Sequence, residues 1–256
     1  MSALVLALAA GAAVGLALGA LGGGGSVLAV PALIYLLGFT PAAATTAGLI
    51  IVTATSLTAL YAHARAGTVR WKAGTLFAAA GLVPAAVAGA AAAHLPQALL
   101  TAAFAVVAAL AAVRMLRPAR TTDGHGRRTV RPARAARAAR AARAGAGLGA
   151  LTGLLGVGGG FLAVPALVTV LAFEMQAAVG TSLLVISANS LASLATRGAT
   201  TAGLDWALIG PFTGAAILGA WDGKRLAAKV TGTLLRRTFA IVLLAVAAFM
   251  LVDAFA

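Results

Sequence analysis

The chain has 256 residues, of which 62% are hydrophobic and only 9% are charged, and it contains no cysteine. Soluble domains carry about 25% charged residues, so this composition, with a mean hydropathy of +1.03, excludes an ordinary soluble enzyme, a disulfide-rich scaffold and a disordered chain. The apolar blocks approach the length that a hydrocarbon core about 30 Å thick requires. We therefore expect an all-α polytopic membrane protein.

The net charge of +14 is concentrated in one hydrophilic stretch, because ten of the 19 basic residues are arginines between Arg114 and Arg143. Such a stretch could bind nucleic acid. Beside membrane spans, however, it more often sets topology or contacts anionic lipid head groups. We expect contact with the lipid bilayer and its anionic head groups and no nucleic acid partner, while assembly into oligomers stays open.

In chain order, the first half predicts an apolar helix over 3–20. No positively charged n-region precedes it, so it is expected to be a membrane span and not a cleaved signal peptide. The glycine run 22–25 then separates this helix from a short apolar segment over 26–38, in which Pro31 should kink the helix. Three longer helices are predicted to follow, over 42–64, 72–93 and 97–116.

The second half shows the same order after an arginine-rich cytoplasmic linker over 118–143. It predicts a helix over 144–155, a glycine run over 156–160 and a short apolar segment over 160–173 that contains Pro165. Three longer helices are predicted to follow, over 176–197, 204–221 and 236–255.

The two halves are also alike in sequence. GGGGSVLAVPAL at 22–33 matches GVGGGFLAVPAL at 156–167 at an offset of 134, and LAVPAL is identical in both copies. Self-similarity of this kind indicates repeated structural units. We expect two homologous transmembrane repeats, 1–117 and 144–256, each with a glycine-interrupted helix plus three longer helices.

The relative orientation of the repeats depends on whether the short segments cross the membrane. Without that crossing each half spans four times and the repeats are parallel; with it each half spans five times and they are inverted. Short cytoplasmic loops hold an excess of Lys and Arg, and only the inverted arrangement places the basic residues over 224–237 on the same side as the linker. We favour inverted repeats, although 13 residues span only about 20 Å as a helix.

The glycine runs between apolar helices predict a binding site. Irregular backbone inside a membrane persists only where protein or a water-filled cavity covers it, and interrupted helices at matching places of two halves are typical of transporter sites. A restarting helix offers unpaired N–H groups to an anion; the alternative is that the glycines only allow close helix packing. The residues of the two runs predicted to bind substrate are Gly22, Gly23, Gly24, Gly25, Ser26, Gly156, Gly158, Gly159 and Gly160.

The helix after each short segment carries a stripe of polar side chains on one face. These side chains could line a cavity and donate hydrogen bonds to substrate oxygens, or they could bond between helices, as Ser and Thr do in membrane bundles. The stripe residues predicted to bind substrate are Thr46, Thr53, Ser56, Ser182 and Asn189. His63 ends the first stripe, and we predict a gating or proton-linked role for it, with an interfacial histidine as the alternative.

No predicted span has an acidic or basic residue near its centre, so no relay of buried acids and no catalytic dyad is visible. The three histidines are scattered and show no metal-ligand spacing. We therefore predict that the protein is not an enzyme and has no metal site and no cofactor.

The sequence resembles the TauE/SafE family of sulfite exporters, also called the sulfonate uptake permease family. The glycine run followed by VPAL occurs twice, GTSL occurs at Gly180–Leu183, and a helix ends at His63 before AGTVRW. The resemblance covers both halves; TAGL at 46–49 and the long linker depart from it. It implies transport of sulfite, sulfonates or related small organic anions.

From these features we expect an exporter that works by alternating access as a multi-pass protein of the cell inner membrane, with a small anionic substrate. The alternative is a membrane-embedded assembly or sulfur-transfer subunit without transport activity of its own.

Overall fold

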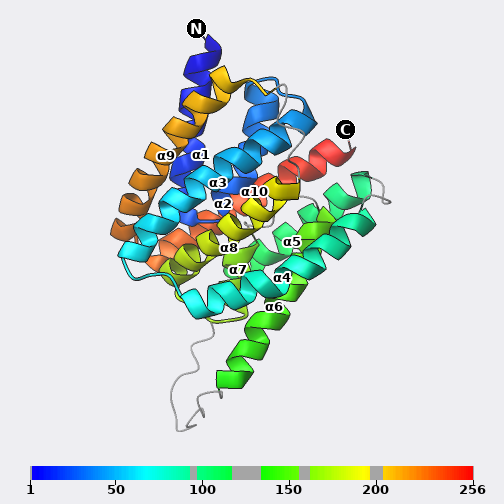
Figure 1. Cartoon of the computed structure of the whole chain (residues 1–256), viewed down its shortest axis with the longest axis vertical. Helices are drawn as coiled ribbons and strands as arrows, with labels where there is room; N and C mark the ends of the chain where they lie inside the picture. Colours follow the sequence, from blue (N-terminus) through cyan, green and yellow to red (C-terminus); the bar gives the residue numbers. More distant parts are fainter. Residues whose placement is uncertain (1, 93–96, 117–133, 156–161, 197–203, 256) are drawn as a thin grey trace.

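The computed structural model describes residues 2–92, 97–116, 134–155, 162–196 and 204–255. In these residues the chain forms ten α-helices and one short π-helix (Figure 1), which confirms the predicted all-α class. The helices are α1 (Ser2–Leu21), α2 (Gly24–Pro31), η1 (Ala32–Leu36), α3 (Pro41–Arg65), α4 (Trp71–Ala92), α5 (Gln97–Leu116), α6 (Arg134–Leu155), α7 (Ala163–Thr169), α8 (Met175–Thr196), α9 (Trp206–Lys229) and α10 (Gly232–Phe255).

In the described part of the chain, four helices contain a stretch that is long and apolar enough to cross a membrane. They are α1, α3, α8 and α10. Large apolar side chains point outward: Val83 on α4 is 71% exposed and Leu218 on α9 is 70% exposed. In water such a surface would be a liability, whereas lipid tails solvate it.

Two helix boundaries differ from the predicted ones by more than four residues. The helix α6 begins at Arg134 instead of 144, because its RAARAARAAR sequence consists of two strong helix formers. The helix α9 continues to Lys229 instead of ending at 221, since Asp222 and Arg225 face solvent and form an ion pair of 3.6 Å along the helix. Charged residues therefore extend both helices and do not end them.

Two pairs of helices pack very closely. The helix α1 runs along α9, and α4 runs along α6. An added Cβ on Gly11, Gly15 or Gly19 of α1 would overlap a backbone carbonyl oxygen of α9, so only glycine fits there. Glycines on α9, α4 and α6 meet their partner helices in the same way: Gly219, Gly223, Gly81, Gly145 and Gly149. Small residues that let two backbones approach are typical of helix pairs in membranes.

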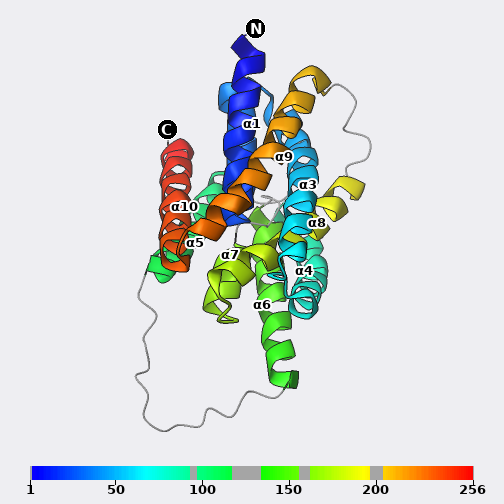
Figure 2. The ribbon, with the colours of Figure 1, turned by 90° about the vertical axis from the view of Figure 1, so that its left-hand side faces the viewer.

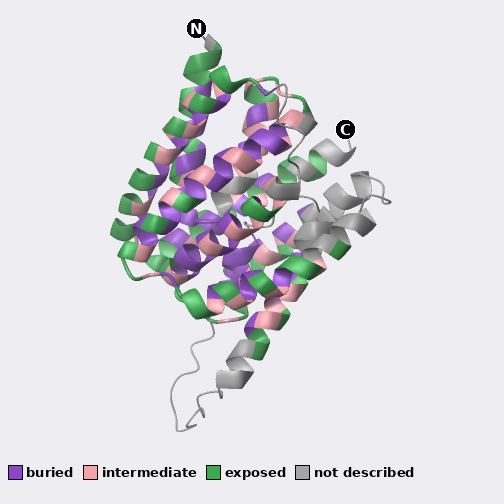
Figure 3. Cartoon of the chain, viewed as in Figure 1, coloured by how far each residue is buried: buried purple, intermediate pink, exposed green. Residues whose placement is uncertain are grey.

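The helices α3 and α8 cross in the middle of the bundle, and buried residues gather around this crossing (Figure 3). The start of α1 and the end of α10 lie towards one end of the bundle, while the turns α3–α4 and α9–α10 and the start of α6 lie towards the other (Figures 1 and 2). We call the second of these the basic end, because Arg65, Arg70, Lys72 and Lys229 flank those turns.

Candidate functional site

The turn between α1 and α2 is built on Gly22. Its φ of +68° is a conformation that residues with a side chain seldom adopt. An added Cβ would lie 2.6 Å from Ser182 Oγ and 3.3 Å from the Cα of Val179, both on α8. Gly22 and Ser182, which the sequence assigns to one site from different halves, therefore lie against each other.

Of the other residues in the two glycine runs, the structure describes only those of the first run. Gly23 is buried, and Gly24, Gly25 and Ser26 form the start of α2, which therefore restarts two residues before the predicted position 26. After Pro31 the helix changes to π-type hydrogen bonding over Ala32–Leu36. The equivalent run of the second half, Gly156, Gly158, Gly159 and Gly160, lies outside the described residues.

The polar stripes of α3 and α8 make hydrogen bonds inside the protein. Thr53 Oγ1 donates to the Leu49 carbonyl at 2.6 Å, and Ser182 Oγ donates to the Val179 carbonyl at 2.8 Å. Ser56 Oγ lies 2.9 Å from Ser187 Oγ and joins the two helices. Interhelical bonding therefore occurs at Ser56, while substrate contact by the stripes stays a prediction.

Two further stripe residues complete this picture. Thr46 is buried and Asn189 is half-buried. Thr46 lies on α3 and Asn189 on α8, the two helices that carry the predicted polar stripes.

His63 lies near the basic end of α3 and is only 4% exposed. Its Nδ1 lies 3.0 Å from Thr68 Oγ1, and its Nε2 lies 3.4 Å from the carbonyl oxygen of Gly19 on α1. The Thr68 hydroxyl also lies 3.1 Å from the backbone carbonyl oxygen of His63. The side chain therefore ties the end of α3 to both the following turn and α1.

This arrangement accommodates both protonation states of His63. A hydroxyl has one hydrogen to donate and can also accept. If Thr68 donates to Nδ1, the ring is neutral and Nε2–H donates to Gly19. If Thr68 instead donates to the His63 carbonyl, Nδ1–H donates to Thr68 and the ring is an imidazolium. Rotation of one hydroxyl thus lets His63 gain or lose a proton without losing a partner.

Gly180 of the GTSL motif allows α8 to approach this pair. An added Cβ would lie 2.8 Å from Thr68 Oγ1 and 3.3 Å from His63 Nδ1. The next residue, Thr181, accepts a hydrogen bond from the backbone N–H of Arg70 at 3.0 Å. The motif therefore fixes the position of the α3–α4 turn against α8.

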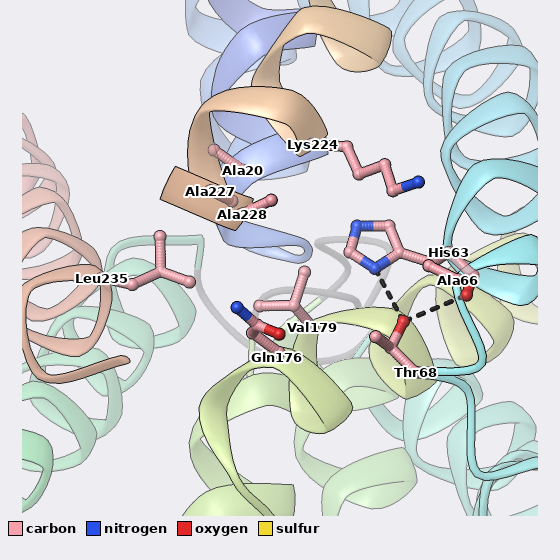
Figure 4. Close-up of a pocket in the computed structure, with 10 residues that line it drawn as sticks. All are labelled: Ala20, His63, Ala66, Thr68, Gln176, Val179, Lys224, Ala227, Ala228 and Leu235. Atoms are coloured by element: carbon pink, nitrogen blue, oxygen red, sulfur yellow. Dashed lines mark hydrogen bonds between the residues drawn. The ribbon is translucent and has the colours of Figure 1, made fainter. Parts of the chain in front are cut away.

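A cavity of about 70 Å³ opens beside His63 (Figure 4). That volume has room for several water molecules or one small ion. Lys224 reaches into this region from α9 and Gln176 from α8, and the side chains of both are visible around the cavity in Figure 4. The lining residues are Ala20, His63, Ala66, Thr68, Gln176, Val179, Lys224, Ala227, Ala228 and Leu235.

Of the polar residues around this cavity, sequence reasoning singled out only His63. The sequence assigned Lys224 to a basic cytoplasmic loop, but α9 extends through it and brings it to α3. Thr68 and Gln176 follow no stripe. Two sequence motifs could have pointed to this region: GTSL, which begins at Gly180, and AGTVRW, which contains Thr68 and follows His63.

The Lys224 ammonium and the Gln176 amide suit the oxygens of an anion, whereas both ring nitrogens of His63 and the Thr68 hydroxyl already have partners inside the protein. Among the described residues, no three His, Asp, Glu or Cys side chains come together as metal ligands would. The chemistry within reach of these side chains is the binding of a small anion.

Comparison with known proteins supports a transporter. The family model described as "Sulfite exporter TauE/SafE" matches residues 7–250. A protein of Xylella fastidiosa strain 9a5c, named "Probable membrane transporter protein", is 31% identical over 251 residues, 97% of this chain and 95% of its own. Its counterpart in strain Temecula1 / ATCC 700964, with the same name, is 30% identical over 253 residues, again 97% and 95% of the two chains. No solved structure matches.

Proposed function

The chain belongs to the TauE/SafE sulfite exporter family and is a multi-pass membrane transporter, and we propose that it exports sulfite, sulfonates or related small organic anions across the cell inner membrane. The observation that carries this proposal is the left-handed glycine turn at Gly22, which lies against Ser182 of the other half, next to a cavity without acidic residues.

We propose that the two halves are structural repeats joined by the segment 118–143. Equivalent hydrogen bonds support this: the Phe39 N–H donates to the Leu33 carbonyl at 3.0 Å, and the Phe173 N–H donates to the Leu167 carbonyl at 3.1 Å. The residue before each phenylalanine has a positive φ, +70° and +53°. Both bonds join residues six positions apart just after a helix, and the two bonds occur at an offset of 134 residues.

An inverted arrangement of the repeats agrees with the packing. The first helix of each half pairs with the fourth helix of the other, α1 with α9 and α6 with α4. Trp71 and Trp206 begin the two fourth helices at opposite ends of the bundle, 50% and 55% exposed (Figure 1). Tryptophan is enriched at both membrane interfaces. On this proposal the basic end faces the cytoplasm.

The substrate would be held where the two interrupted helices approach each other. Because the Gly22 N–H already donates to the Leu18 carbonyl, the anion would be bound by backbone N–H groups of Gly24–Ser26 and of 156–160, together with the Asn189 amide. The hydroxyls of Thr53, Ser56 and Ser182 donate to helix carbonyls and would have to rotate away from them to bind the anion. Rocking of the two halves about the crossing of α3 and α8 would expose this site to each side in turn. His63 would couple that movement to gating or to a proton.

Export of an anion from a cell with a negative interior needs no further energy source. A membrane potential of about 100 mV is worth about 2.3 kcal/mol for each elementary charge, which supports roughly a 50-fold gradient. The proposal therefore requires no cofactor and no catalytic step. The exposed Arg140 and Arg143 at the basic end are available to anionic lipid head groups.

The test is flux of radiolabelled sulfite from proteoliposomes under an imposed membrane potential. We expect wild-type protein to release sulfite faster than empty liposomes and Gly22→Val to abolish release, because valine cannot adopt the turn without strain and would meet Ser182. Gly214→Ala is the matched control, since nothing lies within 4 Å of an added Cβ there.

Deletion of 120–132, which leaves all of α6 in place, should leave flux unchanged, because this segment is not part of the proposed pathway. Wild-type protein that reconstitutes but releases no sulfite or sulfonate would overturn the proposed function, as would a folded Gly22→Val variant with normal flux.

A further inference from the structure

We propose that the cavity beside His63 is a binding site for one small inorganic oxyanion, held by Lys224 and Gln176 and distinct from the glycine turns. The binding itself does not depend on transport. Its use as a staging site on the cytoplasmic side rests on the proposed function.

The charge of the cavity favours an anion. Lys224 lies in α9 and is half-buried, yet none of the ten lining residues is acidic. In the described part of the chain, the ion pair between Asp222 and Arg225 points along α9 and leaves Lys224 without a carboxylate partner. A partly desolvated charge is costly when unpaired, so an incoming anion would supply the missing partner.

The walls of the cavity would strengthen that attraction. Ala20, Val179 and Leu235 are 6%, 1% and 4% exposed and present hydrocarbon to the cavity. Electrostatic attraction is stronger in such surroundings than in water. The Gln176 amide and the Lys224 ammonium both donate hydrogen bonds, and a charged hydrogen bond to an oxyanion is stronger than a neutral one.

The size of the cavity restricts its occupant. About 70 Å³ accommodates an ion the size of sulfite or sulfate, whereas the carbon chain of a larger organic anion would have to extend outside it. The side chains of His63 and Thr68 are bonded to each other, so they form a fixed polar wall and do not fill the space.

The position of the cavity connects it to the glycine turn. Ala20 lines the cavity two residues before Gly22, and Val179 both lines the cavity and contacts the Gly22 turn. Exposed Arg65, Arg70 and Lys72 lie at the same end and would draw anions towards it. An exported anion would thus meet the cavity before the turn.

The binding test is isothermal titration calorimetry of the detergent-purified full chain with sodium sulfite in oxygen-free buffer and with sodium sulfate, at constant ionic strength. We expect Lys224→Gln to weaken binding by about tenfold or more, as loss of a charged hydrogen bond implies. Lys229→Gln is the matched control because it removes the same charge from an exposed position on the same helix, and it should leave the affinity unchanged.

Two further variants separate loss of charge from loss of structure. Lys224→Arg should retain most of the affinity, and Gln176→Ala should weaken it by less than Lys224→Gln does. Size-exclusion profiles and thermal midpoints show whether each variant is folded. Equal affinities for wild-type, Lys224→Gln and Lys229→Gln, or no binding by the wild-type protein, would overturn the proposal.

The outcome for this site can be told apart from the outcome for the proposed function by adding Gly22→Val. This variant should lose flux but still bind sulfite. Binding that depends on Lys224 in a protein without flux would support the cavity site and contradict the exporter. Normal flux with no effect of Lys224→Gln on binding would contradict the cavity site alone.

Discussion

Glycine has two different roles in the helix α1 and in the turn that follows it. Gly11, Gly15 and Gly19 face the backbone of α9, where any side chain would overlap a carbonyl oxygen. Three residues later, Gly22 takes a positive φ and turns the chain beside Ser182 and the cavity. Glycine thus allows the backbones of α1 and α9 to touch, whereas at Gly22 its positive φ allows the turn that follows α1.

The surroundings of the two regions also differ. The contact between α1 and α9 is formed by Ala, Gly and larger apolar residues, whereas the region beyond Gly22 holds His63, Thr68 and Lys224. Close packing and a binding site were the alternatives for the glycine runs of this chain. Close packing occurs at Gly11, Gly15 and Gly19 of α1, which lie outside those runs, while a binding role for Gly22 stays a prediction. The surroundings of a glycine, not its presence, therefore indicate its role.

The most severe way to break the packed region is Gly15→Leu. A leucine there would collide with the α9 backbone, which cannot move like a side chain, so we expect a cost above about 3 kcal/mol and loss of monodisperse protein in size-exclusion chromatography. Ala13→Leu, at an exposed position of the same helix, should behave like wild type. A stable Gly15→Leu protein would refute the close contact of α1 with α9.

A smaller effect is expected at Gly180→Val, which tests the polar region. The neighbours of the added side chain are the Thr68 hydroxyl and the His63 ring, and side chains can shift. We expect a cost of about 1 to 3 kcal/mol and slower sulfite flux, because the pair would be displaced. Ala192→Val, exposed on the same helix, is the control; equal flux in both variants would speak against a role for the pair.

Gly214→Ala tests a glycine of α9 that is not closely packed. An added methyl group at this position of α9 meets nothing within 4 Å, so the higher helix propensity of alanine should stabilise the protein by about 0.5 to 1 kcal/mol. At Gly219 of the same helix the methyl group would overlap the Ala12 carbonyl, and Gly219→Ala should destabilise it. Thermal unfolding compares the two, and shifts of the same sign would contradict this distinction.

The smallest effect concerns the bond between Ser56 and Ser187. Hydrogen bonds between membrane helices average about 0.6 kcal/mol, so a double-mutant cycle of Ser56→Ala and Ser187→Ala should give a coupling energy near that value in unfolding measurements. Thr58 donates to a carbonyl of its own helix, and a cycle of Thr58→Ala with Ser187→Ala should give none. Equal coupling in both cycles would contradict a specific bond.

Several features of the fold followed from the sequence. The apolar blocks predicted α1, α3 and α5 almost to the residue, and the glycine run predicted the break before α2. His63 was selected because it ends a polar stripe, and it does line the cavity. These features are local: apolar length, glycine conformation and helical spacing act over a few turns.

The partners of His63 could not be derived in this way. Lys224 lies 161 positions after it in the sequence, and Gly180 comes close to it only because α8 crosses α3. In a soluble helix the apolar stripe marks the buried face. In lipid both the buried and the outer faces are apolar, so the sequence does not show which faces meet.

The sequence by itself therefore determined the helical class, the membrane character and the glycine break before α2, because each depends on the composition of a continuous stretch. The tertiary structure alone decided that α1 pairs with α9, that Gly22 meets Ser182 and that Lys224 joins His63 around one cavity. Those contacts depend on how closely helices fit, and apolar residues that are equally compatible with lipid and protein do not encode that fit in their pattern.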